Sequence, residues 1–218
     1  MSFRTVIRLS GMALIGGGIL LAIGSIISSL MLPEGLIGMY SSPLAILAYA
    51  LRIVGAVLLL LGLPAVFARQ AQGGRSIVLS LIGFLLLFLG IAMLEIGMNS
   101  IYAFMFPPMA TSLTARPVLL DLDAHRPLGA SIAYTIGLVL ETFGPLVLGI
   151  AILRAKVLPR LAGVMFVVVP LLFILSLPDF LLFQAIVGVI LAGAIGLGFV
   201  FCGYGLLSYQ KQEQVRLG

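Results

Sequence analysis

Three ionisable side chains, Arg52, Glu95 and Glu141, lie inside apolar stretches of this sequence. A charge left uncompensated at the centre of a bilayer costs roughly 2.5–3.5 kcal/mol on insertion scales, so such residues normally face the interior of a helix bundle and have a partner. Basic and acidic groups in apolar surroundings can form an ion pair, hold a polar ligand or exchange protons. These three residues are therefore the first candidates for chemistry.

Helical spacing adds polar neighbours to each of the three, because steps of three or four residues return to the same helix face. The predicted ligand-binding set is Tyr49, Arg52, Glu95, Asn99, Tyr134 and Glu141. Gly137 and Gly144 share a face with Glu141 and leave room beside it, for close helix packing or for a cavity. Pro145 has no backbone N–H, so it frees the carbonyl of Glu141 from its usual helical hydrogen bond.

The depth of each charge follows from the rise of about 1.5 Å per residue in an α-helix. Arg52 and Glu141 are predicted roughly 14 and 15 Å inside their helices, at the same level, so we expect them to be partners. Glu95 is predicted about 5 Å from the end of its helix, and deeper if that helix continues to Met105. Glu95 is the next candidate for Arg52.

Several interpretations of this cluster stay open. It could be a structural ion pair, or a hydrogen-bonded glutamic acid, that fixes helix register. It could instead be a ligand, proton or ion site that opens to the outer side. An intramembrane enzyme with Glu141 or Glu95 as general acid is a third interpretation, which only the lone carboxylates support, so the sequence favours a protein that is not an enzyme. An accessory subunit that packs through glycine faces would need no site.

The composition defines the class of protein that must position these residues. The chain is 62% hydrophobic and 9% charged, with a mean hydropathy of +1.29, whereas soluble domains carry about 25% charged residues. It is therefore predicted to be an all-α membrane helix bundle, one transmembrane domain over residues 1–218. One histidine and one cysteine, Cys202, exclude an intrachain disulfide, bis-His haem, iron–sulfur clusters and the usual zinc sites, so no cofactor or metal is expected.

Six apolar runs are long enough to be membrane spans. They are residues 9–31, 44–68, 77–98, 131–153, 159–176 and 180–207. Residues 99–130 are predicted to form a long outer loop that folds over the bundle, because prolines restrict it and apolar side chains can dock. Asp121, Asp123 and His125 in this loop could bind a cation if it is extended, although a solvated acidic loop is the simpler interpretation.

Basic residues are distributed unevenly between the predicted loops. With the N-terminus inside, the inner segments hold Arg4, Arg8, Arg69, Arg75, Arg154, Lys156, Arg160, Lys211 and Arg216. The outer segments hold Arg116 and Arg126 together with Glu34, Asp121, Asp123 and Asp179. The positive-inside rule then places both termini in the cytoplasm, with an even number of spans. Expected partners are the lipid bilayer, a small hydrophobic ligand, and a membrane-protein partner or second copy, with no nucleic acid.

The C-terminal half carries a recognisable pattern in LETFGPLVLGIAILRAKVLPRLAGVMFVV. A glycine-rich helix leads into a short basic loop, a Pro-Arg pair and a second apolar helix. This arrangement resembles uncharacterised bacterial six-helix membrane proteins of a domain-of-unknown-function family. The resemblance implies the topology and a bacterial inner-membrane location, and it assigns no catalytic or binding residue.

Cysteine accessibility tests the predicted orientation. In a Cys202→Ala background, Ser2→Cys and Gly74→Cys should be protected from a membrane-impermeant thiol reagent added to intact cells, because both lie in predicted cytoplasmic segments. Ala124→Cys should be labelled. Labelling of Gly74→Cys from outside would overturn the orientation.

Overall fold

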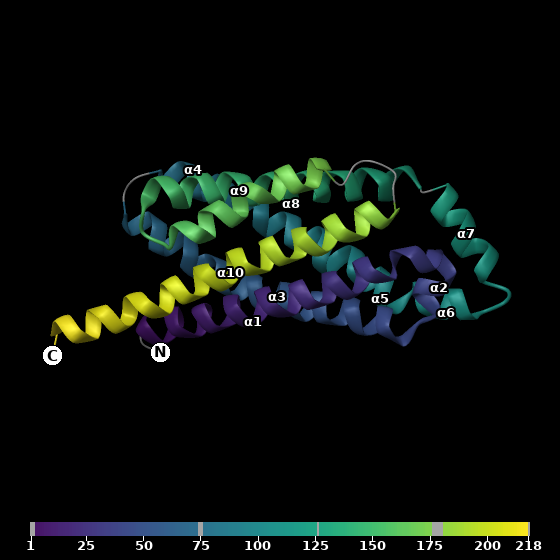
Figure 1. Cartoon of the computed structure of the whole chain (residues 1–218), viewed down its shortest axis with the longest axis horizontal. Coiled ribbons are helices and arrows are strands. Elements are labelled where there is room, and N and C mark those ends of the chain that lie inside the picture. The colour runs from purple at the N-terminus through teal and green to yellow at the C-terminus, as the bar shows by residue number, and fades with distance from the viewer. Residues whose placement is uncertain (1–2, 74–75, 126, 176–180, 218) are drawn as a thin grey trace.

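The computed structural model describes residues 3–73, 76–125, 127–175 and 181–217, and every regular element in these ranges is helical (Figure 1). Some residues used above to predict orientation lie outside the described residues: Ser2, Gly74, Arg75, Arg126 and Asp179. The side chains of Arg4, Asp123, Lys211 and Arg216 do so as well.

Within the described residues, five helical stretches are long and apolar enough to cross a membrane, so the chain is a multi-pass membrane protein with a helical bundle. They are Thr5–Met31, Pro43–Gln72, Ile77–Thr111, Leu128–Ala155 and Ala185–Tyr209. They belong to α1 (Phe3–Met31), α3 (Pro43–Gln72), the segment that begins with α4 (Ile77–Gly90), α8 (Leu128–Ala155) and α10 (Leu181–Leu217). The run predicted as a fifth span forms α9 (Arg160–Leu175). Its 16 residues cover about 24 Å, less than the roughly 30 Å of a hydrocarbon core.

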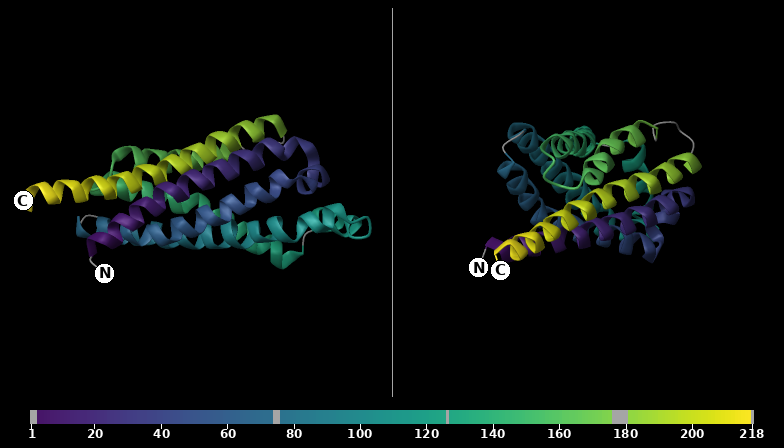
Figure 2. Two further views of the ribbon diagram at one scale, coloured as in Figure 1. Left: turned by 90° about the horizontal axis from the view of Figure 1, so that it is seen from below. Right: turned by 60° about the vertical axis from the view of Figure 1, so that its left-hand side comes forward.

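The long helices form two groups that pack side by side (Figures 1 and 2). In one group α1 packs along both α3 and α10, and in the other α8 packs along both α4 and α9. Contacts of α9 with α10 and of α3 with the α4 segment join the groups. The start of α1, the end of α10, the end of α3 and the turn after α8 lie at one end of the bundle, called here the terminal end (Figure 1).

The opposite end, called here the short-helix end, is built from short helices. They are η1 (Leu32–Glu34), α2 (Gly35–Ser41), α6 (Phe106–Thr111) and α7 (Arg116–Ala124). Tyr40, Ala110 and Leu119, one from each of α2, α6 and α7, are buried in one apolar cluster there.

The segment 99–130, predicted as a loop, is therefore mostly helical. The third apolar run also continues without a break from α4 through η2 (Ile91–Met98) and α5 (Asn99–Phe104). The prediction of a loop was wrong in its secondary structure, and the prolines do not prevent these helices. Pro107 and Pro117 lie in the first turns of α6 and α7, where a missing N–H breaks no helical hydrogen bond.

Glycines bring α8 against the backbone of α4 and against a side chain of η2. A Cβ added at Gly144 would lie 2.5 Å from the Leu87 nitrogen, and one added at Gly137 would lie 2.8 Å from Leu94 side-chain atoms. Both distances are far inside van der Waals contact, so only glycine permits this approach. Of the two alternatives for Gly137 and Gly144, the structure shows close packing, because both glycines lie against the neighbouring helix.

A glycine-to-alanine comparison tests this contact. Gly144→Ala should lower the free energy of unfolding by about 1–3 kcal/mol, the usual cost of an overpacked core, measured by denaturant titration in mixed micelles. Gly193→Ala on α10 is the matched control, because a Cβ there meets no atom within 4 Å. Equal stability of the two variants would contradict the close approach of α8 to α4.

Candidate functional site

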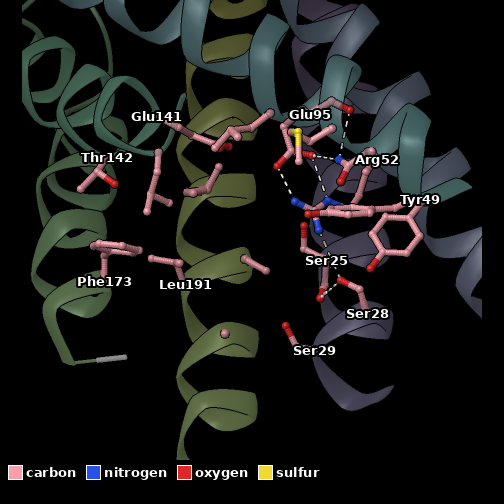
Figure 3. Close-up of a pocket in the computed structure, with 18 of the residues that line it drawn as sticks. Ser25, Ser28, Ser29, Tyr49, Arg52, Glu95, Glu141, Thr142, Phe173 and Leu191 are labelled. Carbon is pink, nitrogen blue, oxygen red and sulfur yellow. Dashed lines mark hydrogen bonds and ion pairs between the residues drawn. The ribbon is translucent and has the colours of Figure 1, made fainter. Parts of the chain in front are cut away.

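A cavity of about 280 Å³ lies between the two groups of helices (Figure 3). All six residues predicted from the sequence line it: Tyr49, Arg52, Glu95, Asn99, Tyr134 and Glu141. These residues come from the first third of α3, the first half of α8, η2 and the start of α5. The cavity is therefore in the half of the bundle nearer the short-helix end.

Arg52 and Glu95 form a two-pronged ion pair on one wall of this cavity. The Nε of Arg52 donates to Oε2 of Glu95 at 2.9 Å, and Nη2 donates to Oε1 at 2.6 Å. Asn99 Nδ2 donates to the same Oε2 at 2.8 Å. Both carboxylate oxygens of Glu95 are thus bonded, and its side chain is only 4% exposed. Parallel charge-assisted bonds of this kind are among the strongest in proteins.

The partner of Arg52 is therefore Glu95 and not Glu141, which the depth estimate favoured. That estimate ended the third helix at residue 98. The helix continues through α5, which places Glu95 deeper than the first 5 Å. Glu95 also lies in η2, a π-helical segment, where the wider turn changes which residues share a face.

Close helix contacts position both acidic groups and the arginine. A Cβ added at Gly24 of α1 would lie 2.7 Å from Cγ of Arg52, so glycine lets the arginine side chain pass between α1 and α3. A Cβ at Gly90 would lie 2.6 Å from the backbone nitrogen of Glu141. This contact brings the α8 backbone at Glu141 directly against the end of α4, one turn before Glu95.

Glu141 is the second carboxyl group of the cavity. It extends from α8 toward Glu95 in Figure 3, and its residue is half-buried. The Arg52 guanidinium attracts it, and the Glu95 carboxylate repels it when both carboxyl groups are ionised. When one of the two is protonated, their side chains share a hydrogen bond. Among the described residues, no guanidinium, amide or hydroxyl group donates a hydrogen bond to it. Glu141 therefore shares a proton with Glu95 or, when both carboxyl groups are ionised, faces the cavity without a side-chain donor among the described residues.

Hydroxyl groups that the sequence analysis missed complete the polar wall. Ser25, Ser28 and Ser29 of α1 and Thr142 of α8 line the cavity. Nη1 of Arg52 lies 3.5 Å from Oγ of Ser28. These residues are too common in apolar helices to be singled out from sequence, although the spacing of Ser25, Ser28 and Ser29 does put them on one helix face.

Aromatic rings lie on the side of the cavity nearer the short-helix end. Tyr49 and Tyr102 line the cavity and lie with their ring centroids 5.3 Å apart. Behind them Tyr40 packs on Tyr49 at 6.0 Å and edge-on against Phe106 at 5.0 Å. Tyr40 and Tyr49 are only 4% and 5% exposed. Such offset and edge-to-face contacts make a rigid wall.

The acidic candidates of the former loop stay apart from this cavity. Asp121 and His125 lie one turn apart around the end of α7, exposed, with Nδ1 of His125 3.0 Å from Oδ1 of Asp121. The segment is helical and not extended, so the alternation proposed for a cation site does not apply. In the described part of the chain no three histidine, cysteine, aspartate or glutamate side chains are grouped as a metal site would require.

The cavity therefore combines one guanidinium with two carboxyl groups. No protein family, curated protein or solved structure matches this chain, so the chemistry has to be inferred from the cavity residues themselves. With both carboxyl groups ionised, the cluster would carry one uncompensated negative charge in surroundings of low polarity, which is costly. A proton, a cation or a hydrogen-bond donor brought by a ligand would offset that charge.

A double-mutant cycle tests the pairing of Arg52 with Glu95. Arg52→Leu or Glu95→Leu alone should destabilise the protein by about 3–5 kcal/mol, because each leaves a buried charge without its partner. The double variant should lose less than the sum of the singles, by a coupling of about 0.5–3 kcal/mol. Unfolding in mixed micelles measures all four free energies.

The matched cycle pairs Arg52→Leu with Glu141→Leu. Its coupling should be smaller, since Glu141 makes no salt bridge with Arg52 among the described residues. Equal coupling in the two cycles would show that Arg52 is shared between the carboxyl groups, contrary to the geometry.

Proposed function

We propose that this membrane protein binds a small, largely apolar molecule, or a proton, in the cavity beside Glu141. The observation that carries the proposal is the second carboxyl group. A structural ion pair accounts for Arg52 and Glu95, which satisfy each other with two hydrogen bonds. It does not account for Glu141, a costly acidic residue that faces the same cavity and has no guanidinium, amide or hydroxyl donor among the described residues.

The proposal includes an orientation in which both termini are cytoplasmic and the protein lies in the inner (plasma) membrane with six spans. Two observations support it. The start of α1 and the end of α10 lie at the same end of the bundle (Figure 1). Arg69, Arg154 and Arg160 lie where α3 and α8 end and α9 begins, at that terminal end, in keeping with the positive-inside rule. In this orientation the cavity lies in the outer half of the membrane.

Reaction with dicyclohexylcarbodiimide tests the state of Glu141. This apolar reagent modifies carboxyl groups that face apolar surroundings and can take up a proton, and it leaves a stable acylurea. We expect peptide mass mapping of treated membranes to find the reagent on Glu141. Glu95 should be spared because its two oxygens are bonded to Arg52. Exposed Glu34 should be spared because water surrounds it. No modification of Glu141, or equal modification of Glu95, would contradict the proposal.

Extraction of the purified protein tests the function itself. A small molecule bound beside Glu141 should be enriched in solvent extracts of wild type and of Glu34→Gln, the matched control, and depleted in Glu141→Gln. If the site serves protons alone, proteoliposomes should show a proton flux that Glu141→Gln abolishes and Glu34→Gln retains. If the protein shows neither a bound molecule nor a proton flux, the proposed function is refuted.

A further inference from the structure

A second cavity, which is apolar and has a volume of about 370 Å³, lies between α8 and α9. Its lining includes Val139, Phe143 and Leu146 of α8 and Val167 and Leu171 of α9. Val139, Phe143 and Leu171 are 49%, 51% and 59% exposed. On a membrane-spanning helix such exposed apolar side chains face lipid, so this groove is open to the hydrocarbon of the bilayer.

The apolar groove and the polar cavity share a wall. Leu138, Thr142 and Phe173 line both of them. Leu138 and Thr142 flank Glu141 on α8 within one helical turn. A chain lying in the groove would therefore have its end within reach of the Glu141 carboxylate. From Val139 to Leu146 the groove follows α8 for about 10 Å, room for a stretch of alkyl chain.

The polar wall selects the chemistry of the headgroup. A carboxylate accepts hydrogen bonds only, and the oxygens of Ser25 and Ser29 on the same cavity also offer lone pairs. An ammonium group donates three hydrogen bonds and would offset the charge of the second carboxylate. An anionic headgroup would meet two carboxylates, and the Arg52 guanidinium is already bonded to one of them.

We propose that the ligand is a single-chain amphiphile with a basic amine headgroup, which enters from the bilayer between α8 and α9. Its ammonium group binds beside Glu141 and its alkyl chain lies in the apolar groove. This inference rests on the proposed function and names the ligand class of the same site.

Photoreactive probes test the headgroup and the path together. Dodecylamine and dodecanol, each carrying a diazirine near the end of the chain, are added to the protein in phosphatidylcholine nanodiscs. The amine should crosslink to α8 and α9 peptides of the groove. Glu141→Gln should lower that crosslinking about tenfold, the loss of one charge-assisted hydrogen bond, and leave the alcohol unchanged. Equal crosslinking by amine and alcohol would overturn the headgroup assignment.

Two variants of α9 test the groove. Val167→Phe places a larger side chain in the groove and should lower crosslinking by both probes at least several-fold. Val164→Phe is the matched control, since Val164 is 42% exposed on the same helix and does not line the groove. Crosslinks that map to other helices, or that are equally strong in both variants, would overturn the lateral path.

Coupling of the amine to Glu141 can be tested on the wild-type protein, so the result does not depend on whether a variant folds. Carbodiimide activates a carboxyl group, and an amine within reach then displaces the urea to form an amide. With dodecylamine present, dicyclohexylcarbodiimide should join the amine to Glu141. If Glu141 gives only the acylurea, the amine does not reach it; the ligand class is then wrong while the proposed function stands. If Glu141 does not react at all, the proposed function fails as well.

Discussion

The cost of burying the guanidinium of Arg52 constrains much of this structure. A buried charge is tolerated only with a bonded partner, and Glu95 supplies it with both carboxylate oxygens. Because Arg52 is on α3 and Glu95 on η2, the pair sets the relative depth and rotation of these two helices. Ser28 of α1 and Asn99 of α5 add hydrogen bonds to the pair, so four elements meet at one buried point. A shift of any of them would leave a charge or an amide unsatisfied.

The small residues around the pair matter because ion pairs need short distances. Gly24 lets the Arg52 side chain pass between α1 and α3, and Gly90 brings the α8 backbone against the α4 segment. A larger residue at either position would push the helices apart. Packing and electrostatics are therefore coupled here: the glycines bring the backbones close, and closeness gives the charged groups their partners.

The same packing leaves Glu141 at the edge of two different environments. On one side lie the ion pair and the serines of α1, and on the other lies the apolar groove between α8 and α9. Pro145 and Pro170 remove backbone donors from α8 and α9 near this boundary, and helices bend most readily at such positions. A carboxylate at a junction of polar cavity and lipid-facing groove suits a ligand that is itself polar at one end and apolar at the other.

The sequence by itself determined the class of protein and six residues of the cavity. Apolar runs and the 3.6-residue period are local properties, so they predicted a helical membrane bundle and placed Tyr49 beside Arg52 and Tyr134 beside Glu141. All six predicted residues line one cavity because charges that are costly in lipid turn inward from each helix. The orientation of the bundle in the membrane stays a prediction, since it depends on loop charge and not on the fold.

Tertiary structure alone decided the partner of Arg52, the helical form of residues 99–130 and the groove beside the cavity. Pairing depends on how helices far apart in sequence are shifted and rotated relative to one another, and their packing sets both. A depth estimated by counting residues from a predicted helix end carries the error in that end. The π-helical turn at Glu95 also rotates the residues that follow it, which the 3.6-residue period of an α-helix does not predict. From the sequence, Gly137 and Gly144 were equally compatible with a cavity and with close helix packing. The positions of Leu87 and Leu94 show close packing.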